Sequence, residues 1–126
     1  MTDTARTFLV LGSALAALAV TLGAFGAHAL KGRLSPEDLE IYRTAVLYHF
    51  LHALGLIATA LAVQHLPEAA AARWAGWALL AGVVLFSGSL YLLVLTGARL
   101  LGAVTPLGGA AFIAGWVLLA AAALRS

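Results

Sequence analysis

Charged residues are confined to a few short segments of this 126-residue chain, and their spacing limits the fold more than any other feature. Residues 7–30, 44–67, 74–98 and 100–124 contain no Lys, Arg, Asp or Glu, so all 12 charged side chains lie in the 28 remaining residues. A charge-free apolar stretch of 18 or more residues is typical of a membrane-spanning helix, because about 20 residues rising about 1.5 Å each cross a ~30 Å hydrocarbon core. Four such stretches predict an all-α integral membrane four-helix bundle with short loops.

The same spacing excludes several classes of protein. Four apolar spans are incompatible with a soluble globular domain. The net charge of +2 is spread over separate loops and forms no basic patch, so nucleic acid is not an expected partner. The longest segment outside the spans, 31–43, has thirteen residues and cannot form a domain of its own. We therefore expect residues 1–126 to be a single four-span domain, with any chemistry placed between helices or at their ends.

Helix-start and helix-stop residues refine the ends of the spans. Ser35 followed by Pro36 is a strong helix start, with Ser as the N-cap and Pro at the first helical position. Pro67 lacks a backbone N–H and marks the stop of this helix. Thr105 followed by Pro106 repeats the cap-then-proline pattern and predicts a later start for the last helix, after a turn at 98–104. The expected helices are about 8–30, 36–66, 74–97 and 106–124.

The sequence predicts one aspect of how the spans are oriented in the membrane. An even number of spans puts both termini on the same side of the membrane. Four basic residues lie on the side of segments 31–43 and 98–104, and three lie on the side of the termini. This difference is too small for the positive-inside rule to choose between the two orientations.

Small residues predict close packing between the helices. Burial in lipid does not drive apolar helices together, so close van der Waals contact and interhelical hydrogen bonds must do so. Ala and Gly make up a third of the chain and recur at a spacing of four. Such rows are Ala19/Gly23/Ala27, Ala78/Gly82 and Ala111/Gly115.

The polar residues inside the spans are the candidate functional residues. At about 100° per residue, His49 and His52 lie in one sector of their helix, and Ser87 and Tyr91 share one face of theirs. His28 shares a sector of the first span with Thr21. All five candidates, His28, His49, His52, Ser87 and Tyr91, lie at mid-membrane or in the half nearest segments 31–43 and 98–104, where Thr105 and Pro106 also lie. The spacing predicts a polar pocket open to that side and closed toward the termini.

The residues alone are compatible with three roles for this polar cluster. Neutral His is a good interhelical hydrogen-bond donor and acceptor. An ionisable group inside a membrane also suggests a small-molecule, lipid or proton site. His49 and His52, at positions i and i+3, could share a metal or haem, although a metal site wants three or four ligands and no intramembrane carboxylate exists. We therefore expect neither a metal nor a cofactor.

Five motifs in order give a family resemblance over nearly the whole chain. They are LGAFGAH at 22–28, YHFLHA at 48–53, LFSGSLY at 85–91, TPLGG at 105–109 and GW at 115–116. The sequence resembles the YgdD/YwdK-like family of small bacterial membrane proteins of unknown function, which is related to eukaryotic transmembrane protein 256. The resemblance implies a four-span integral membrane protein, here of the bacterial plasma membrane, and brings no activity with it.

The expected function follows from the small-residue rows and from the lack of a complete catalytic constellation. We expect a non-enzymatic bundle that acts by interaction, surrounded by membrane lipids and partnered by a second copy or by another membrane protein. The alternative is small-molecule, lipid or proton binding at the His/Ser/Tyr pocket. In that case a dead-end pocket is favoured over a channel, because few polar residues continue toward the termini.

Overall fold

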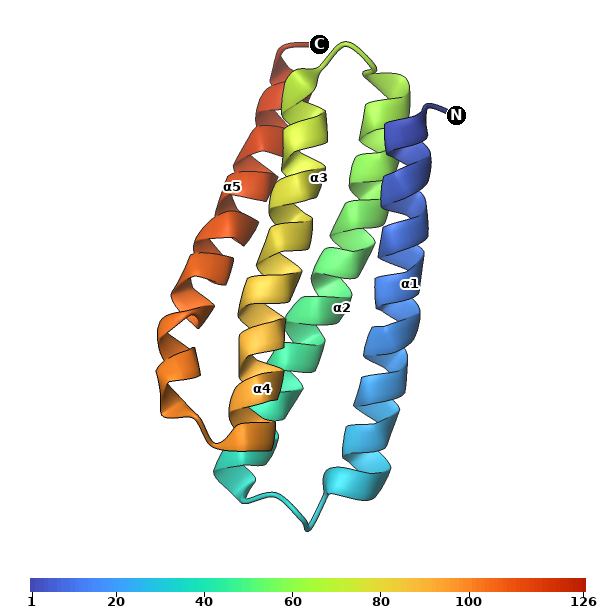
Figure 1. Cartoon of the computed structure of the whole chain (residues 1–126). Coiled ribbons are helices and arrows are strands. Elements are labelled where there is room, and N and C mark those ends of the chain that lie inside the picture. Colours follow the sequence, from blue (N-terminus) through green and yellow to red (C-terminus); the bar gives the residue numbers. More distant parts are fainter.

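Four helical rods joined by short turns make up the protein in a computed structural model that describes all residues 1–126 (Figure 1). Two rods contain a π-helical turn, and the last begins with a 3-10 turn. The elements are α1 (Asp3–Phe25), η1 (Gly26–Leu30), α2 (Pro36–His65), α3 (Ala70–Gly82), η2 (Val83–Ser87), α4 (Gly88–Thr96), η3 (Arg99–Ala103) and α5 (Thr105–Leu124).

Each rod is long and apolar enough to cross a membrane. The rods run over Asp3–Leu30, Pro36–His65, Ala70–Thr96 and Arg99–Leu124, with 28, 30, 27 and 26 residues. At about 1.5 Å per residue, each exceeds the ~30 Å hydrocarbon core. There are no strands. The prediction of an all-α four-helix membrane protein with short loops is confirmed.

The helix starts follow the cap chemistry in one case and depart from it in another. Ser35 accepts the Asp38 N–H at 3.1 Å, and Pro36 occupies the first helical position of α2. Thr105 is not a cap. Val104 before it already has helical dihedrals and provides no side-chain cap, because η3 leads into α5 without an extended residue. Pro106 does lie at the start of α5, but the expected cap role of Thr105 is wrong.

Two α-helices begin earlier than the sequence predicts. α1 begins at Asp3 rather than near residue 8, because the Thr2 hydroxyl accepts the Ala5 N–H at 3.1 Å and caps the helix there. The Thr2 N–H also donates to the Gln64 side chain of α2 at 2.9 Å. α3 begins at Ala70 rather than near 74, so the run of alanines is its first turn. Asp3, Arg6 and Arg73 thus lie on helical extensions of the apolar spans.

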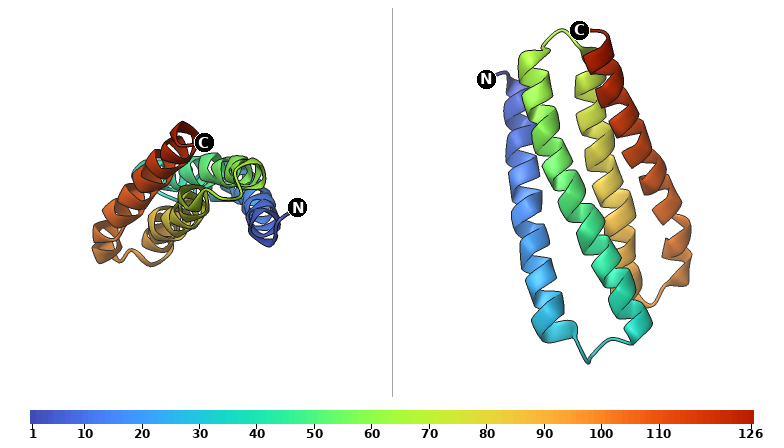
Figure 2. Two further views of the ribbon diagram at one scale, coloured as in Figure 1. Left: turned by 90° about the horizontal axis from the view of Figure 1, so that it is seen from above. Right: turned by 180° about the vertical axis from the view of Figure 1, so that it is seen from behind.

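The rods form a curved row rather than a closed square. α1 packs mainly on α2, α5 packs mainly on α3, and α2 makes the contacts that join the two pairs. Seen along the rods (Figure 2, left), α1 and α5 lie at the two ends of the row. Both termini and the α2–α3 turn lie at one end of the molecule, and the two other turns lie at the opposite end (Figure 1). α2 is consequently the most buried rod.

Glycines allow the backbones to approach where the rods cross. A Cβ on Gly12 of α1 would lie 2.7 Å from Ile57 Cγ1 and 3.0 Å from the Ala53 carbonyl oxygen of α2. A Cβ on Gly115 of α5 would lie 2.6 Å from Leu79 Cδ2 of α3. Such contacts are the close packing that holds helices together in lipid.

Candidate functional site

The side chain of His52 links α2 to α5 at mid-span. Trp116 donates its indole N–H to His52 Nε2 at 3.0 Å, and His52 Nδ1 lies 2.7 Å from the Tyr48 carbonyl oxygen. Because Nε2 accepts, the single proton of the neutral imidazole must be on Nδ1, from which it donates to the carbonyl. Both ring nitrogens of this buried side chain are therefore engaged, and no lone pair is left for a metal.

Aromatic rings surround His52 and fix its orientation. Its imidazole stacks on Phe112 of α5, with ring centroids 3.5 Å apart and planes 12° apart. The Tyr48 ring lies parallel to the imidazole, with ring centroids 6.0 Å apart. Its centroid is 4.6 Å from that of the Phe86 ring of η2. Gly55, one turn later in α2, leaves space for the indole of Trp116, because a Cβ there would lie 2.9 Å from Cη2. The cluster joins α2, η2 and α5 through packing as well as hydrogen bonding.

His49 belongs to a second and separate centre. Its Nδ1 lies 2.8 Å from the Tyr91 hydroxyl of α4, and the side chain is only 2% exposed. Nε2 of His49 is buried without a hydrogen-bond partner. The Tyr91 ring lies 5.8 Å from that of Tyr42, whose hydroxyl donates to the Leu22 carbonyl. This centre joins α1, α2 and α4.

Ser87 and Ser89 provide two further links between helices. Ser87 ends the π-helical turn η2, is fully buried, and donates to the Ala45 carbonyl of α2 at 2.8 Å. Ser89 donates to the Phe86 carbonyl at 2.9 Å and lies 2.7 Å from the Thr105 hydroxyl of α5. The Thr105 hydroxyl also lies 3.4 Å from the Leu101 carbonyl oxygen, so each of the two hydroxyls has a carbonyl acceptor of its own and either hydrogen can occupy the bond between them. The Thr105 hydroxyl thus contacts α4 instead of capping its own helix.

His28 is outside both centres, so the expected grouping with the other candidates is wrong. Its side chain is exposed and has no hydrogen-bond partner. Thr21, on the same stripe, donates to the Ala17 carbonyl of its own helix at 2.8 Å and can therefore face lipid. α1 instead buries the face bearing Gly12 and Ala19, where small side chains allow the closest approach to α2.

The candidate residues consequently do not form one pocket. His49 points toward α4, and His52, three residues later, points toward α5. No three His, Asp or Glu side chains converge anywhere in the molecule. No cavity has His28, His49, His52 or Ser87 in its lining. A shared ligand on His49 and His52 is therefore not available in this geometry.

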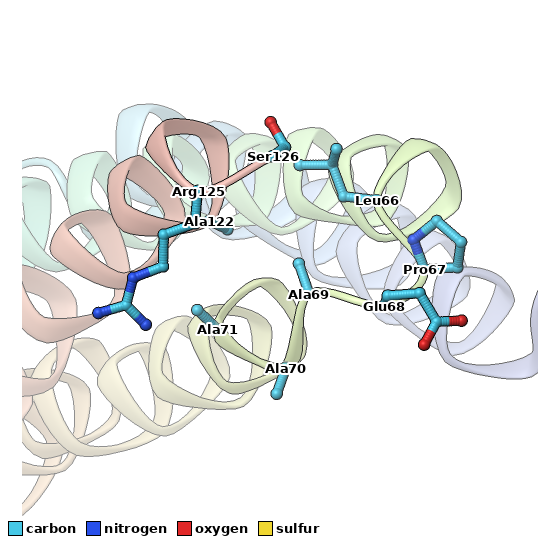
Figure 3. Close-up of a pocket in the computed structure, with 9 residues that line it drawn as sticks. All are labelled: Leu66, Pro67, Glu68, Ala69, Ala70, Ala71, Ala122, Arg125 and Ser126. Atoms are coloured by element: carbon cyan, nitrogen blue, oxygen red, sulfur yellow. The ribbon is translucent and has the colours of Figure 1, made fainter.

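The cavity drawn in Figure 3 lies at the end of the molecule that carries the termini. It has a volume of about 370 Å³ between the α2–α3 turn and the end of α5. Its charged lining residues, Glu68 and Arg125, lie on opposite sides and point away from each other (Figure 3). The remaining lining is mostly alanine and offers no convergent polar groups. We assign no site to it.

Two contributors were not foreseen from the sequence. Trp116, noted in the sequence only as part of the GW motif, supplies the hydrogen bond to His52. Ser89 was not singled out, although it lies within the LFSGSLY motif. Residues on separate helices cannot be paired by spacing along one helix, because the pairing depends on the rotation and depth of each rod.

Four apolar spans held together by intramembrane polar pairs define a multi-span α-helical membrane protein. A family model described as "Protein of unknown function (DUF423)" matches residues 22–109, and the chain belongs to this family. It is 48% identical over 120 residues to the UPF0382 membrane protein YwdK of Bacillus subtilis, covering 95% of this chain and 98% of that protein. The resemblance to YwdK-like proteins is thereby confirmed.

Other relatives match over similar lengths. The UPF0382 membrane protein SERP0230 of Staphylococcus epidermidis is 46% identical over 120 residues, covering 95% of this chain and 97% of that protein. The UPF0382 membrane protein SH2409 of Staphylococcus haemolyticus is 47% identical over 114 residues, covering 90% and 92%. No solved structure matches the chain.

Proposed function

We propose that this chain is a non-enzymatic structural or interaction protein of the bacterial plasma membrane. The observation that carries the proposal is the complete hydrogen bonding of His52, whose two nitrogens are engaged by Trp116 and by the Tyr48 carbonyl. A general base, a proton carrier or a metal ligand needs a ring nitrogen that can be released. Here release would leave the indole N–H of Trp116 without an acceptor inside an apolar span, where an unsatisfied donor costs about 1–3 kcal/mol.

The other intramembrane polar groups support the same proposal. Ser87 donates to the Ala45 carbonyl, the Thr105 and Ser89 hydroxyls share a hydrogen bond, and Tyr91 pairs with His49. Each contact joins two different helices of the row. In lipid, where apolar burial gives no net drive for helix association, such bonds and close packing determine which helices are neighbours. The polar residues act as connectors within the bundle.

The open ends of the row provide surface for partners. α1 and α5 each have only one main neighbour, and large apolar side chains such as Val10, Ile113 and Val117 are exposed on them. These surfaces contact membrane lipids, and we propose that a second copy or another membrane protein also docks there. Both termini would then lie on one side of the membrane, since they lie at one end of the molecule (Figure 1).

A double-mutant cycle in detergent tests the proposal. His52→Leu and Trp116→Phe, alone and together, should show a coupling energy of about 0.6–1.7 kcal/mol in the free energy of unfolding, the range for interhelical hydrogen bonds in membranes. Trp74→Phe is the control, because this side chain is 65% exposed. A His52→Leu variant that is as stable as the wild type and assembles as it does, but has lost its cellular function, would contradict the proposal.

One observation favours a second candidate function, binding of a small molecule or a proton at His49 and Tyr91. Nε2 of His49 is buried and has no hydrogen-bond partner, which is unusual for a polar atom in a folded protein. A ¹⁵N NMR titration of the His49 imidazole between pH 5 and pH 8 tests this candidate. A site reached by protons predicts a change in the ring resonances over this range, whereas a structural contact predicts none.

A further inference from the structure

A groove runs along the outer face of α1 and α2 at the end opposite the termini. It has a volume of about 500 Å³ and is lined mainly by apolar residues of the two helices. We call it the α1–α2 groove and define it by Ala19, Gly23 and Ala27 on the first rod and Arg43, Val46 and Phe50 on the second. The small side chains of the first rod leave the space, and the larger side chains of α2 form the opposite wall.

The groove is closed toward the protein and open toward the surrounding bilayer. Tyr42 forms the inner wall, because its ring fills the position beside Gly26 and its hydroxyl donates to the Leu22 carbonyl. On the outer side, Val20 and Leu47 are 60% and 54% exposed. α1 and α2 are neighbours, and their ribbons diverge toward this end of the molecule (Figures 1 and 2). A ligand can therefore enter sideways from lipid.

Arg43 is the only charged residue in the lining of the groove. It is exposed, and the single ion pair of the molecule joins Arg6 to Asp3 instead. The nearby acids Glu37 and Glu40 line a different hollow, beside Phe86 and Thr105. The guanidinium thus lies at the boundary of the second span with no carboxylate paired to it.

Arg43 and the apolar groove are arranged so that one can bind the headgroup and the other an acyl chain of the same membrane lipid. From Arg43 to Phe50 the helix rises about 10 Å toward the bilayer centre, and the groove follows this direction. A guanidinium binds phosphate through two parallel hydrogen bonds, and an apolar groove accepts hydrocarbon. We propose that the α1–α2 groove binds one anionic phospholipid, with its phosphate on Arg43 and one acyl chain between α1 and α2. This proposal is independent of the contacts of His52 and stands or falls separately from the proposed function.

Native mass spectrometry of the full chain, released from detergent containing equal amounts of phosphatidylglycerol and phosphatidylcholine, tests the headgroup site. The wild type should retain one phosphatidylglycerol about fivefold more often than phosphatidylcholine, as one basic residue near a membrane surface can provide. Arg43→Gln should remove this preference. Arg99→Gln is the matched control, because Arg99 is exposed at the same end and lines no cavity. Equal retention of the two lipids by the wild type, or an unchanged preference in Arg43→Gln, would overturn the proposal.

A second pair of variants tests the acyl-chain site. Ala24 is exposed and lines the groove, so Ala24→Phe should fill it and reduce retention of phosphatidylglycerol severalfold. Ala14→Phe places the same ring on an exposed position of α1 outside the groove and should retain the lipid as the wild type does. Thermal melts of both variants are the check that each one folds. Equal retention by these two folded variants would contradict the assignment of the groove.

Discussion

Trp116 of α5 donates its indole N–H to Nε2 of His52 in α2, across 64 positions of the sequence. The contact fixes the proton of His52 on Nδ1, where the Tyr48 carbonyl accepts it. It is the clearest evidence for how the intramembrane histidines are used. A residue type associated with metal binding and proton transfer here serves as a two-sided hydrogen-bonding bridge between helices.

The contact of α5 with the π-helical turn η2 depends on Gly108. A Cβ at this position would overlap the backbone nitrogen of Phe86, which cannot move aside as a flexible side chain can. Gly108→Ala should therefore lower the free energy of unfolding by about 1–3 kcal/mol, the usual effect of overpacking. Gly109→Ala is the control, because its nearest atom would be 3.9 Å away. Thermal melts in detergent measure both, and a Gly108→Ala variant as stable as Gly109→Ala would show that the close contact is absent.

The hydroxyl of Tyr91 should matter more than that of Tyr48. Tyr91→Phe removes the partner of His49 Nδ1, and Nε2 of that ring already lacks one, so a buried imidazole would lose its last hydrogen bond. We expect a loss of about 1–3 kcal/mol in unfolding free energy. Tyr48→Phe should have little effect, since its ring packs on Phe86 and the Tyr48 hydroxyl makes no hydrogen bond. Equal effects of the two substitutions would contradict this account of the His49 centre.

Ser87 should be more important than Thr21, although both are hydroxyl residues inside spans. Ser87→Ala removes a buried bond from η2 to α2 and should lower stability by about 0.6 kcal/mol, the average for such bonds in membranes. Thr21→Ala removes a bond within α1 on an exposed face, so stability should not fall. Denaturant titrations of both variants give the comparison. A loss confined to Thr21→Ala would mean that the polar stripe of α1, and not its small-residue face, contacts a neighbour.

The sequence was sufficient for the class of fold because charge exclusion and helix length act along one helix at a time. The start of α2 at Pro36 followed from Ser35 for the same reason. Contacts between helices are harder to predict from the sequence. His28 was grouped with His52 by spacing and depth, yet α1 turns the face bearing Gly12 toward α2 and leaves His28 outside. The pairing of Trp116 with His52 likewise depends on the rotation of two rods, which the pattern of neither helix contains.

The protonation pattern of His52 tests the account most directly. In ¹⁵N NMR spectra of the reconstituted protein, Nδ1 of His52 should show the resonance of a protonated ring nitrogen and Nε2 that of an unprotonated acceptor. Trp116→Phe should shift the Nε2 resonance and leave Nδ1 protonated, because the Tyr48 carbonyl still accepts from it. A proton on Nε2 in the wild type, or an Nε2 resonance unaffected by Trp116→Phe, would contradict the role of His52 as a structural bridge.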